Sequence, residues 1–169
     1  MKKVSVRNII MKKLLSVFFT MLLSSVLFAQ SADVITEILS SQQANLGQVA
    51  YLCAIQQNLV QEDASYEDAF AALVSEGLIS EESDSSESVT LARASFLLSK
   101  NWEINGGVMY SLTNGSQRYT FKQFVADGVL APTAEPSSFI SGAEVLNLYS
   151  ACLRRYGGYD VKTVSMEAE

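Results

Sequence analysis

The sequence predicts an all-α protein, a small bundle of about six short helices that follows a cleaved signal peptide. Three observations support this prediction. Apolar residues recur at helical spacing and end at glycines, and a unit of this kind occurs twice along the chain at a fixed offset. The first 29 residues, in contrast, have the composition of a leader.

Residues 1–29 predict an export signal because basic residues precede an unbroken apolar or small stretch at 14–29, and small polar residues follow it. Cleavage is expected after Ala29, with Ser31 as the alternative, and translation starts at Met1 or at Met11. The competing interpretation is an uncleaved anchor, but a spanning helix needs roughly 20 apolar residues. We therefore expect an exported protein, periplasmic or extracellular, with no membrane span after cleavage.

The predicted cleavage changes the charge of the chain. It removes five of the 12 basic residues and none of the 18 acidic ones, so the net charge falls from −6 to −11. Such a charge repels nucleic-acid phosphates and anionic lipid, and we expect no nucleic-acid partner. The remaining residues suit one domain, predicted to be helical over 30–156 and to end in a disordered tail at 157–169.

The internal repeat aligns residues 70–98 with residues 121–149 at a constant offset of 51. Each copy has an apolar helical stripe, then a glycine suited to a left-handed helix end, then a polar loop. Thr90 and Ser141 are placed to cap second helices at about 91–100 and 142–156. Five positions are identical, pairing Phe70 with Phe121, Val74 with Val125, Gly77 with Gly128, Ser86 with Ser137 and Ala92 with Ala143.

Other parts of the chain fit the same fold. Residues 45–60 predict a further second helix, and residues 33–39 predict a short helix. The segment 101–118 breaks the repeat, since glycine-containing turn signals at 106–107 and 114–115 bracket the short apolar stretch 108–112. We favour one helical turn for that stretch over a short strand.

The order of helix, glycine, polar loop and capped helix resembles the S-layer homology module. Thr90-Leu91-Ala92-Arg93 and Ser141-Gly142-Ala143-Glu144 stand where that family has a Thr-Arg-Ala-Glu-like motif. Pro136 lies in the second loop, and Trp102 matches the aromatic residue that precedes a module's first helix. The resemblance covers about residues 45–156 and implies the helix–loop–helix fold. In the family the motif Arg helps to bind an anionic wall polymer; here Leu91 and Gly142 replace it, so the resemblance favours the fold more than that activity.

The residues available for catalysis are few. The chain has no His, which removes the usual general base and the commonest transition-metal ligand. It has no phosphate loop, nucleophile elbow or dinucleotide fingerprint. We therefore expect no enzymatic activity, no cofactor and no metal. The alternative is a carboxylate-dependent hydrolase acting on envelope glycan, with candidates of the right type at Glu76, Glu103, Asp127 and Glu144.

The candidate binding residues are aromatic, because rings that are not part of an apolar stripe are free to stack on a ligand. They are Trp102, Tyr110 and Tyr119. Cys53 and Cys152 are either a disulfide pair, as export permits, or two buried thiols. The leading hypothesis is a non-enzymatic envelope protein that contacts cell-wall glycan or another envelope protein. A self-assembling structural subunit is a further alternative.

Overall fold

The computed structural model describes residues 33–157, so the predicted signal peptide and nearly all of the predicted tail lie outside the described residues. Within that range every regular element is a helix, which confirms the all-α prediction. None of these helices is both long and apolar enough to cross a membrane. Residues 37–157 belong to one compact unit, to which the following description refers.

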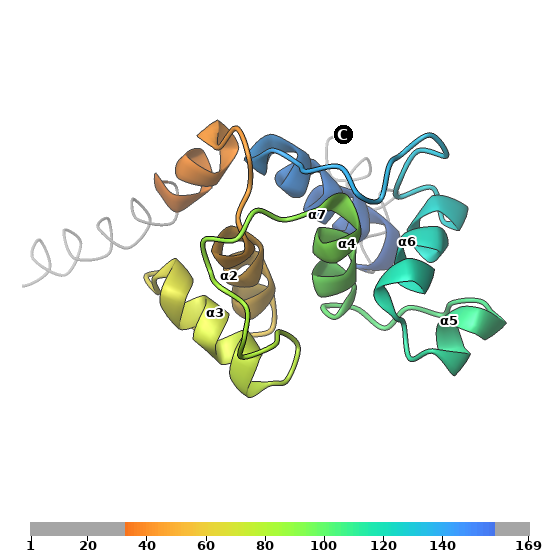
Figure 1. The fold of residues 1–169 in the computed structure, drawn as a ribbon, viewed down its shortest axis with the longest axis horizontal. Coiled ribbons are helices and arrows are strands. Elements are labelled where there is room, and N and C mark those ends of the chain that lie inside the picture. Colours follow the sequence, from red (N-terminus) through yellow and green to blue (C-terminus); the bar gives the residue numbers. More distant parts are fainter. Residues whose placement is uncertain (1–32, 158–169) are drawn as a thin grey trace, which may run out of the picture. The chain divides into compact units, whose positions relative to one another are not determined.

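The helices agree closely with the predicted ones (Figure 1). After a helix at 33–40 come α2 (Leu46–Gln56), α3 (Tyr66–Ser75), α4 (Leu91–Ser99), α5 (Val108–Leu112), α6 (Gln117–Ala126) and α7 (Gly142–Tyr156). The described range therefore holds seven helices rather than six, and residues 108–112 form a helix as favoured. The predicted helix at 45–60 ends early, because Asn58 takes a left-handed conformation with φ 56°.

The two segments that are 51 residues apart in sequence share several backbone features. α3 and α6 begin and end at equivalent positions, and Gly77 and Gly128 follow them with φ values of 70° and 75°. Beyond each glycine the chain turns back, so that the Leu78 N–H donates to the Leu73 carbonyl at 3.0 Å and the Val129 N–H to the Phe124 carbonyl at 2.9 Å. A side chain at either glycine would be strained.

The helices α2, α4 and α7 begin next to one another in space, an arrangement that the sequence did not reveal. The residues before their N-caps are joined in a closed ring of backbone hydrogen bonds. Ala44 N–H donates to the Ile140 carbonyl at 2.8 Å, Val89 N–H to Ala44 at 3.0 Å and Ile140 N–H to Val89 at 3.4 Å. All three residues are buried, so this ring satisfies polar groups that would otherwise be costly. Three capped helices thus start from one point.

The N-caps follow the predicted chemistry. The Thr90 hydroxyl accepts from the Arg93 N–H at 3.4 Å, and the Ser141 hydroxyl accepts from the Glu144 N–H at 3.3 Å. Asn45 caps α2 in the same way. Each cap satisfies one of the free N–H groups at a helix start and stabilises that start by about 1 kcal/mol.

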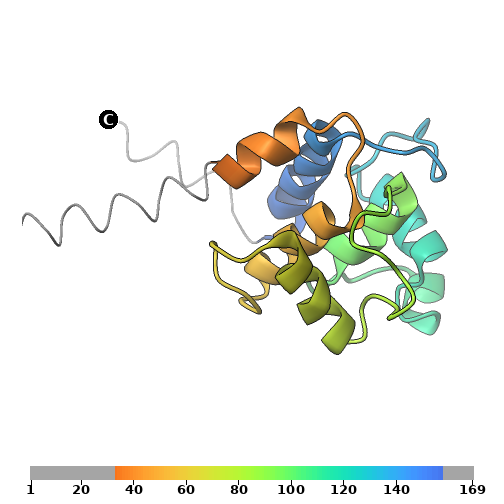
Figure 2. The same cartoon turned by 60° about the vertical axis from the view of Figure 1, so that its left-hand side comes forward.

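The helices pack in a row. α3 contacts α2, α2 contacts α4, α4 contacts α6, and α6 contacts α5. Figure 1 shows this order across the view, and Figure 2 shows α3 and α5 again on opposite sides. The interior is apolar, and its largest fully buried side chains include Phe124, Leu73, Leu46, Leu98 and Val49. Each such side chain stabilises the fold by roughly 1.5–3 kcal/mol.

Candidate functional site

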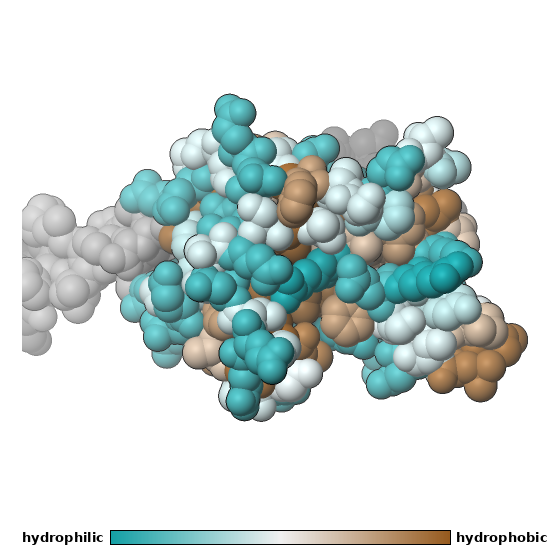
Figure 3. All heavy atoms as spheres, in the orientation of Figure 1, coloured by the Kyte–Doolittle hydropathy of each residue, from teal (hydrophilic) through white to brown (hydrophobic). Residues whose placement is uncertain are grey.

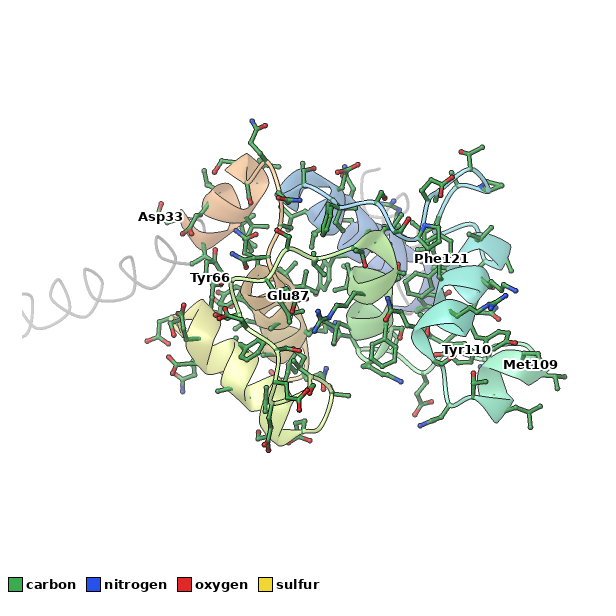
Figure 4. The ribbon with its side chains drawn as sticks, in the orientation of Figure 1. Asp33, Tyr66, Glu87, Met109, Tyr110 and Phe121 are labelled. Atoms are coloured by element: carbon green, nitrogen blue, oxygen red, sulfur yellow. The ribbon has the colours of Figure 1, made fainter. Side chains whose placement is uncertain are left out.

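An open, largely apolar hollow lies between the start of α4 and one face of α6. We call it the α4–α6 groove; it is lined by Ala92, Gln117, Arg118, Phe121, Lys122 and Pro136 and has a volume of about 660 Å³. Positions three and four apart lie on one face of a helix, so α6 points Gln117, Phe121 and their neighbours into the same hollow. Figure 4 labels Phe121 on this part of α6. The volume falls in the usual range for small-ligand sites.

The groove is cationic in an otherwise acidic chain. Arg118 and Lys122 line it, and none of the lining residues carries a carboxylate. Among the described residues the two ion pairs are Arg93 with Glu87 and Arg155 with Asp127, so neither groove cation is neutralised by a salt bridge there. The Lys122 ammonium lies 5.6 Å from the centre of the Tyr119 ring, an arrangement that leaves its charge available.

The floor of the groove is apolar. Phe121, Pro136 and the methyl group of Ala92 contribute this apolar surface, and the two cations line the same groove. Such a surface suits a ligand that combines an apolar ring face with a negative group, because the guanidinium can bind a carboxylate or phosphate through two parallel hydrogen bonds.

The equivalent position beside α3 is closed. Gly47 of α2 corresponds to Ala92 of α4, since each donates its N–H to a loop later in the chain, Gly47 to Ser85 after α3 at 2.7 Å and Ala92 to Pro136 after α6 at 3.0 Å. A Cβ atom on Gly47 would lie 3.1 Å from the Tyr66 Cβ and 3.3 Å from the Ser85 carbonyl oxygen. Backbone and side chain therefore fill the space that is open at Ala92.

The predicted aromatic residues only partly come together. Trp102 and Tyr110 line a second, smaller pocket of about 330 Å³, together with residues of α4 and of the segment around α5. Tyr119 lines neither pocket and lies beside Lys122 on α6. Trp102 is half-buried, and its ring centre lies 5.8 Å from that of Tyr149 and 6.4 Å from that of Tyr156. Much of the Trp102 ring thus packs within the protein.

Two of the candidate carboxylates stabilise helices. Glu144 accepts from the Ser141 N–H at 2.8 Å, and the hydrogen bonds from the backbone and the hydroxyl of Ser141 lower the pKa of its carboxyl. Asp127 accepts from the Tyr156 hydroxyl at 2.6 Å and from Gln123 at 3.0 Å. Partial burial opposes ionisation of Asp127, but these bonds and the Arg155 charge hold its pKa below the usual value.

The other two carboxylates, Glu76 and Glu103, are exposed, Glu76 at the end of α3 and Glu103 in the segment before α5. The four candidates thus belong to four separate places in the fold. No group of three metal-ligating side chains occurs in the described part of the chain.

Cys53 and Cys152 are free thiols in the structure, both fully buried, on α2 and α7. Burial raises the pKa of the Cys53 thiol to about 12, although a hydrogen bond with Asn101 opposes the change. Burial, with a smaller contribution from Cys53, also raises the pKa of Cys152 to about 12. Both thiols are therefore protonated at neutral pH and are poor nucleophiles. The predicted disulfide stays a prediction.

Sequence reasoning missed the groove residues Arg118, Phe121 and Lys122 as a site, although Phe121 had been placed in the repeat. The available signal was two cations four residues apart on one helix of a very acidic chain. The described part of the chain is all-α and includes a cationic apolar groove and an aromatic pocket. The sequence matches no family model, and no curated protein and no solved structure is significantly similar to it.

Proposed function

We propose that this protein is an exported, non-catalytic component of the cell envelope that binds an acidic glycan in the α4–α6 groove. The single observation that carries the proposal is the pairing of two cations, Arg118 and Lys122, with an apolar floor in a chain of strongly acidic composition. A sugar ring has an apolar face that packs on aromatic and proline rings. Its acidic substituent would bind the guanidinium of Arg118 and the ammonium of Lys122.

The resemblance to the S-layer homology module supports the same proposal. The groove opens beside Ala92, within the Thr90-Leu91-Ala92-Arg93 segment that resembles the family motif. The family's motif Arg is replaced by Leu91, but α6 supplies cations from its own face instead. An SLH-like protein whose cations have moved from the motif to the neighbouring helix would keep the affinity for an anionic polymer.

The same groove is less suited to hydrolysis. Glycoside cleavage by carboxylates needs two of them facing one bond, about 5–10 Å apart. The groove has none among its lining residues, while Glu144 caps its own helix α7 and Asp127 links the end of α6 to Tyr156 of α7. These observations favour binding over the hydrolase alternative.

The experiment is retention of the purified exported protein on cell-wall sacculi. Arg118→Glu combined with Lys122→Glu reverses both groove cations, and we expect retention to fall about tenfold or more. The matched control is Arg154→Glu with Lys100→Glu, which makes the same charge change outside the groove and should leave most of the retention. Circular dichroism checks that each variant is folded.

Two results would contradict the proposal. Wild-type retention no higher than that of an unrelated acidic protein rules out the glycan ligand. Equal losses in the groove variant and in its control show that binding depends on total charge alone, and that the groove is not the site.

A further inference from the structure

The helix α5 exposes a compact group of large apolar side chains. The exposed fractions are 75% for Val108, 48% for Met109 and 74% for Leu112, and we call these three residues the α5 cap. Figure 3 shows the apolar surface at the outer end of the molecule, where α5 lies in Figure 1. Single exposed apolar residues are ordinary, whereas three on one short helix indicate a contact surface.

The inner side of α5 is closely packed, which keeps the α5 cap on the outside. Tyr110 lies on the inner side of α5 between two glycines. If Gly106 or Gly115 carried a Cβ atom, that atom would lie only 2.4 Å or 2.9 Å, respectively, from the Tyr110 ring. The Gly107 N–H also donates to the Gln123 side chain of α6 at 2.9 Å. Figure 4 shows Tyr110 pointing back and Met109 pointing outward. The cap therefore remains exposed rather than folding onto its own surface.

Cations occur in the segments on either side of the α5 cap in sequence. The Lys100 ammonium donates to the Asn114 carbonyl at 3.3 Å, just beyond the end of α5. Lys122 is adjacent in sequence to Gln123, which binds the start of α5. Between residues 100 and 126 the chain has three cations, the third being Arg118, and one acidic residue, Glu103.

The acidic residues gather at the other side of the molecule. Residues 37–99 contain ten carboxylates and one cation, and α3 is separated from α5 by α2, α4 and α6. Neighbouring helices pack about 8–10 Å apart, and the Debye length in physiological salt is about 8 Å. Net charge alone predicts repulsion from anionic lipid, but at the α5 cap this acidic half is screened.

We propose that the α5 cap inserts into the surface of an anionic lipid bilayer, with Lys100 and Lys122 beside the headgroups. Apolar side chains next to cations are the features by which proteins bind the interface of such a bilayer. A second copy of the chain is a poorer occupant, because a stable interface buries about 800 Å² per partner. Three side chains on a five-residue helix fall far short of that area.

The test uses the exported protein and vesicles of phosphatidylglycerol with phosphatidylcholine, compared with vesicles of phosphatidylcholine alone. We expect Val108→Ser combined with Leu112→Ser to lower the partition into anionic vesicles about tenfold. Phe139→Ser, at another exposed apolar residue, is the matched control and should leave partition unchanged. Raised salt should weaken wild-type binding.

A second measurement separates cap insertion from binding by any other part of the chain. An environment-sensitive fluorophore is attached to Met109→Cys and, as a reference, to Glu76→Cys on the acidic side. Cys53 and Cys152 are fully buried and should stay unlabelled. We expect a blue shift and quenching by bilayer-embedded quenchers at position 109 only.

Three outcomes would overturn the proposal. They are equal partition of the cap variant and the wild type, an unchanged spectrum at position 109 on bound protein, and sedimentation showing a dimer that the cap variant loses. The last outcome would assign the cap to a second copy of the chain. Since the cap variant leaves the α4–α6 groove intact, sacculus retention stays unaffected, and the two proposals fail independently.

Discussion

The segments around α3–α4 and around α6–α7 share several backbone features and have opposite surfaces. In both, an apolar helix ends at a left-handed glycine, and a loop leads to a capped second helix. Yet Glu67 stands where the second copy has Arg118, and Ala71 where it has Lys122. The backbone depends on a few buried or conformationally special residues, and the outer faces are free to differ in charge.

The two helix starts differ in what packs against them, although a loop binds each of them. Gly47 lets Tyr66 and Ser85 pack directly against the start of α2, whereas Ala92 and Gln117, the residue equivalent to Tyr66, line the open groove at the start of α4. A single methyl group thus accompanies the difference between a closed contact and an open groove. Three predictions test this comparison, in order of expected effect.

The largest effect is expected in the part that both copies share. Phe124 of α6 and Leu73 of α3 occupy equivalent positions, and both are fully buried. Phe124→Ala should lower the free energy of unfolding by about 3–5 kcal/mol and Leu73→Ala by about 2–5 kcal/mol, since each leaves a cavity in the core. Urea unfolding followed by circular dichroism measures both. If either substitution lowers the free energy of unfolding by less than about 1 kcal/mol, α3 and α6 do not both contribute to one core.

The elements that could be predicted are those fixed by local chemistry. The glycine stops at Gly77 and Gly128, the caps at Thr90 and Ser141 and the turn signals around α5 all act within a few residues of sequence, and the structure has each of them. The early end of α2 at Gln56 was missed because the left-handed Asn58 gives a weaker signal than a glycine.

The elements that could not be predicted depend on contacts between distant parts of the chain. The ring joining Ala44, Val89 and Ile140 uses backbone groups, which carry no sequence signature. Trp102 and Tyr110 were chosen as free aromatic residues and do share a pocket, but Tyr119 points elsewhere. The α4–α6 groove depends on which loop residue faces which helix start, a relation that appears only in three dimensions.

The second prediction concerns the closed site. Gly→Ala within a helix ordinarily stabilises it by up to about 1 kcal/mol. At Gly47 the added Cβ meets the Tyr66 Cβ and the Ser85 backbone, which cannot move independently. We therefore expect Gly47→Ala to destabilise the protein by about 1 kcal/mol, through overpacking that exceeds the gain in helix propensity.

The matched variant is Ala92→Gly, which should cost about 1 kcal/mol or less through helix propensity alone. Thermal unfolding of both variants measures the difference. A stabilised Gly47→Ala protein would show that the contact at α2 is not tight, and that a methyl group does not distinguish the two sites.

The smallest expected effect on stability comes from a difference between the N-caps of α4 and α7. The third helical position is Glu144 in α7 but Arg93 in α4, so only the Ser141 cap includes a carboxylate that binds back to the cap. The hydrogen bonds from Ser141 lower the pKa of Glu144 from its usual 4.5. A carboxyl with a lowered folded-state pKa stabilises the fold above the unfolded value, and this stabilisation is lost as the pH falls through the folded value.

Glu144→Gln should therefore be less stable than the wild type at pH 7, by a few tenths of a kcal/mol, and equally stable once the pH is well below 4.5. Glu81→Gln, at an exposed loop carboxylate that takes no part in a helix cap, is the control and should follow the wild type from pH 7 to pH 3. Urea midpoints measured from pH 7 to pH 3 give both curves. Parallel curves for the wild type and Glu144→Gln would mean that the reciprocal bond contributes nothing, and that the two copies are capped alike despite their different residues.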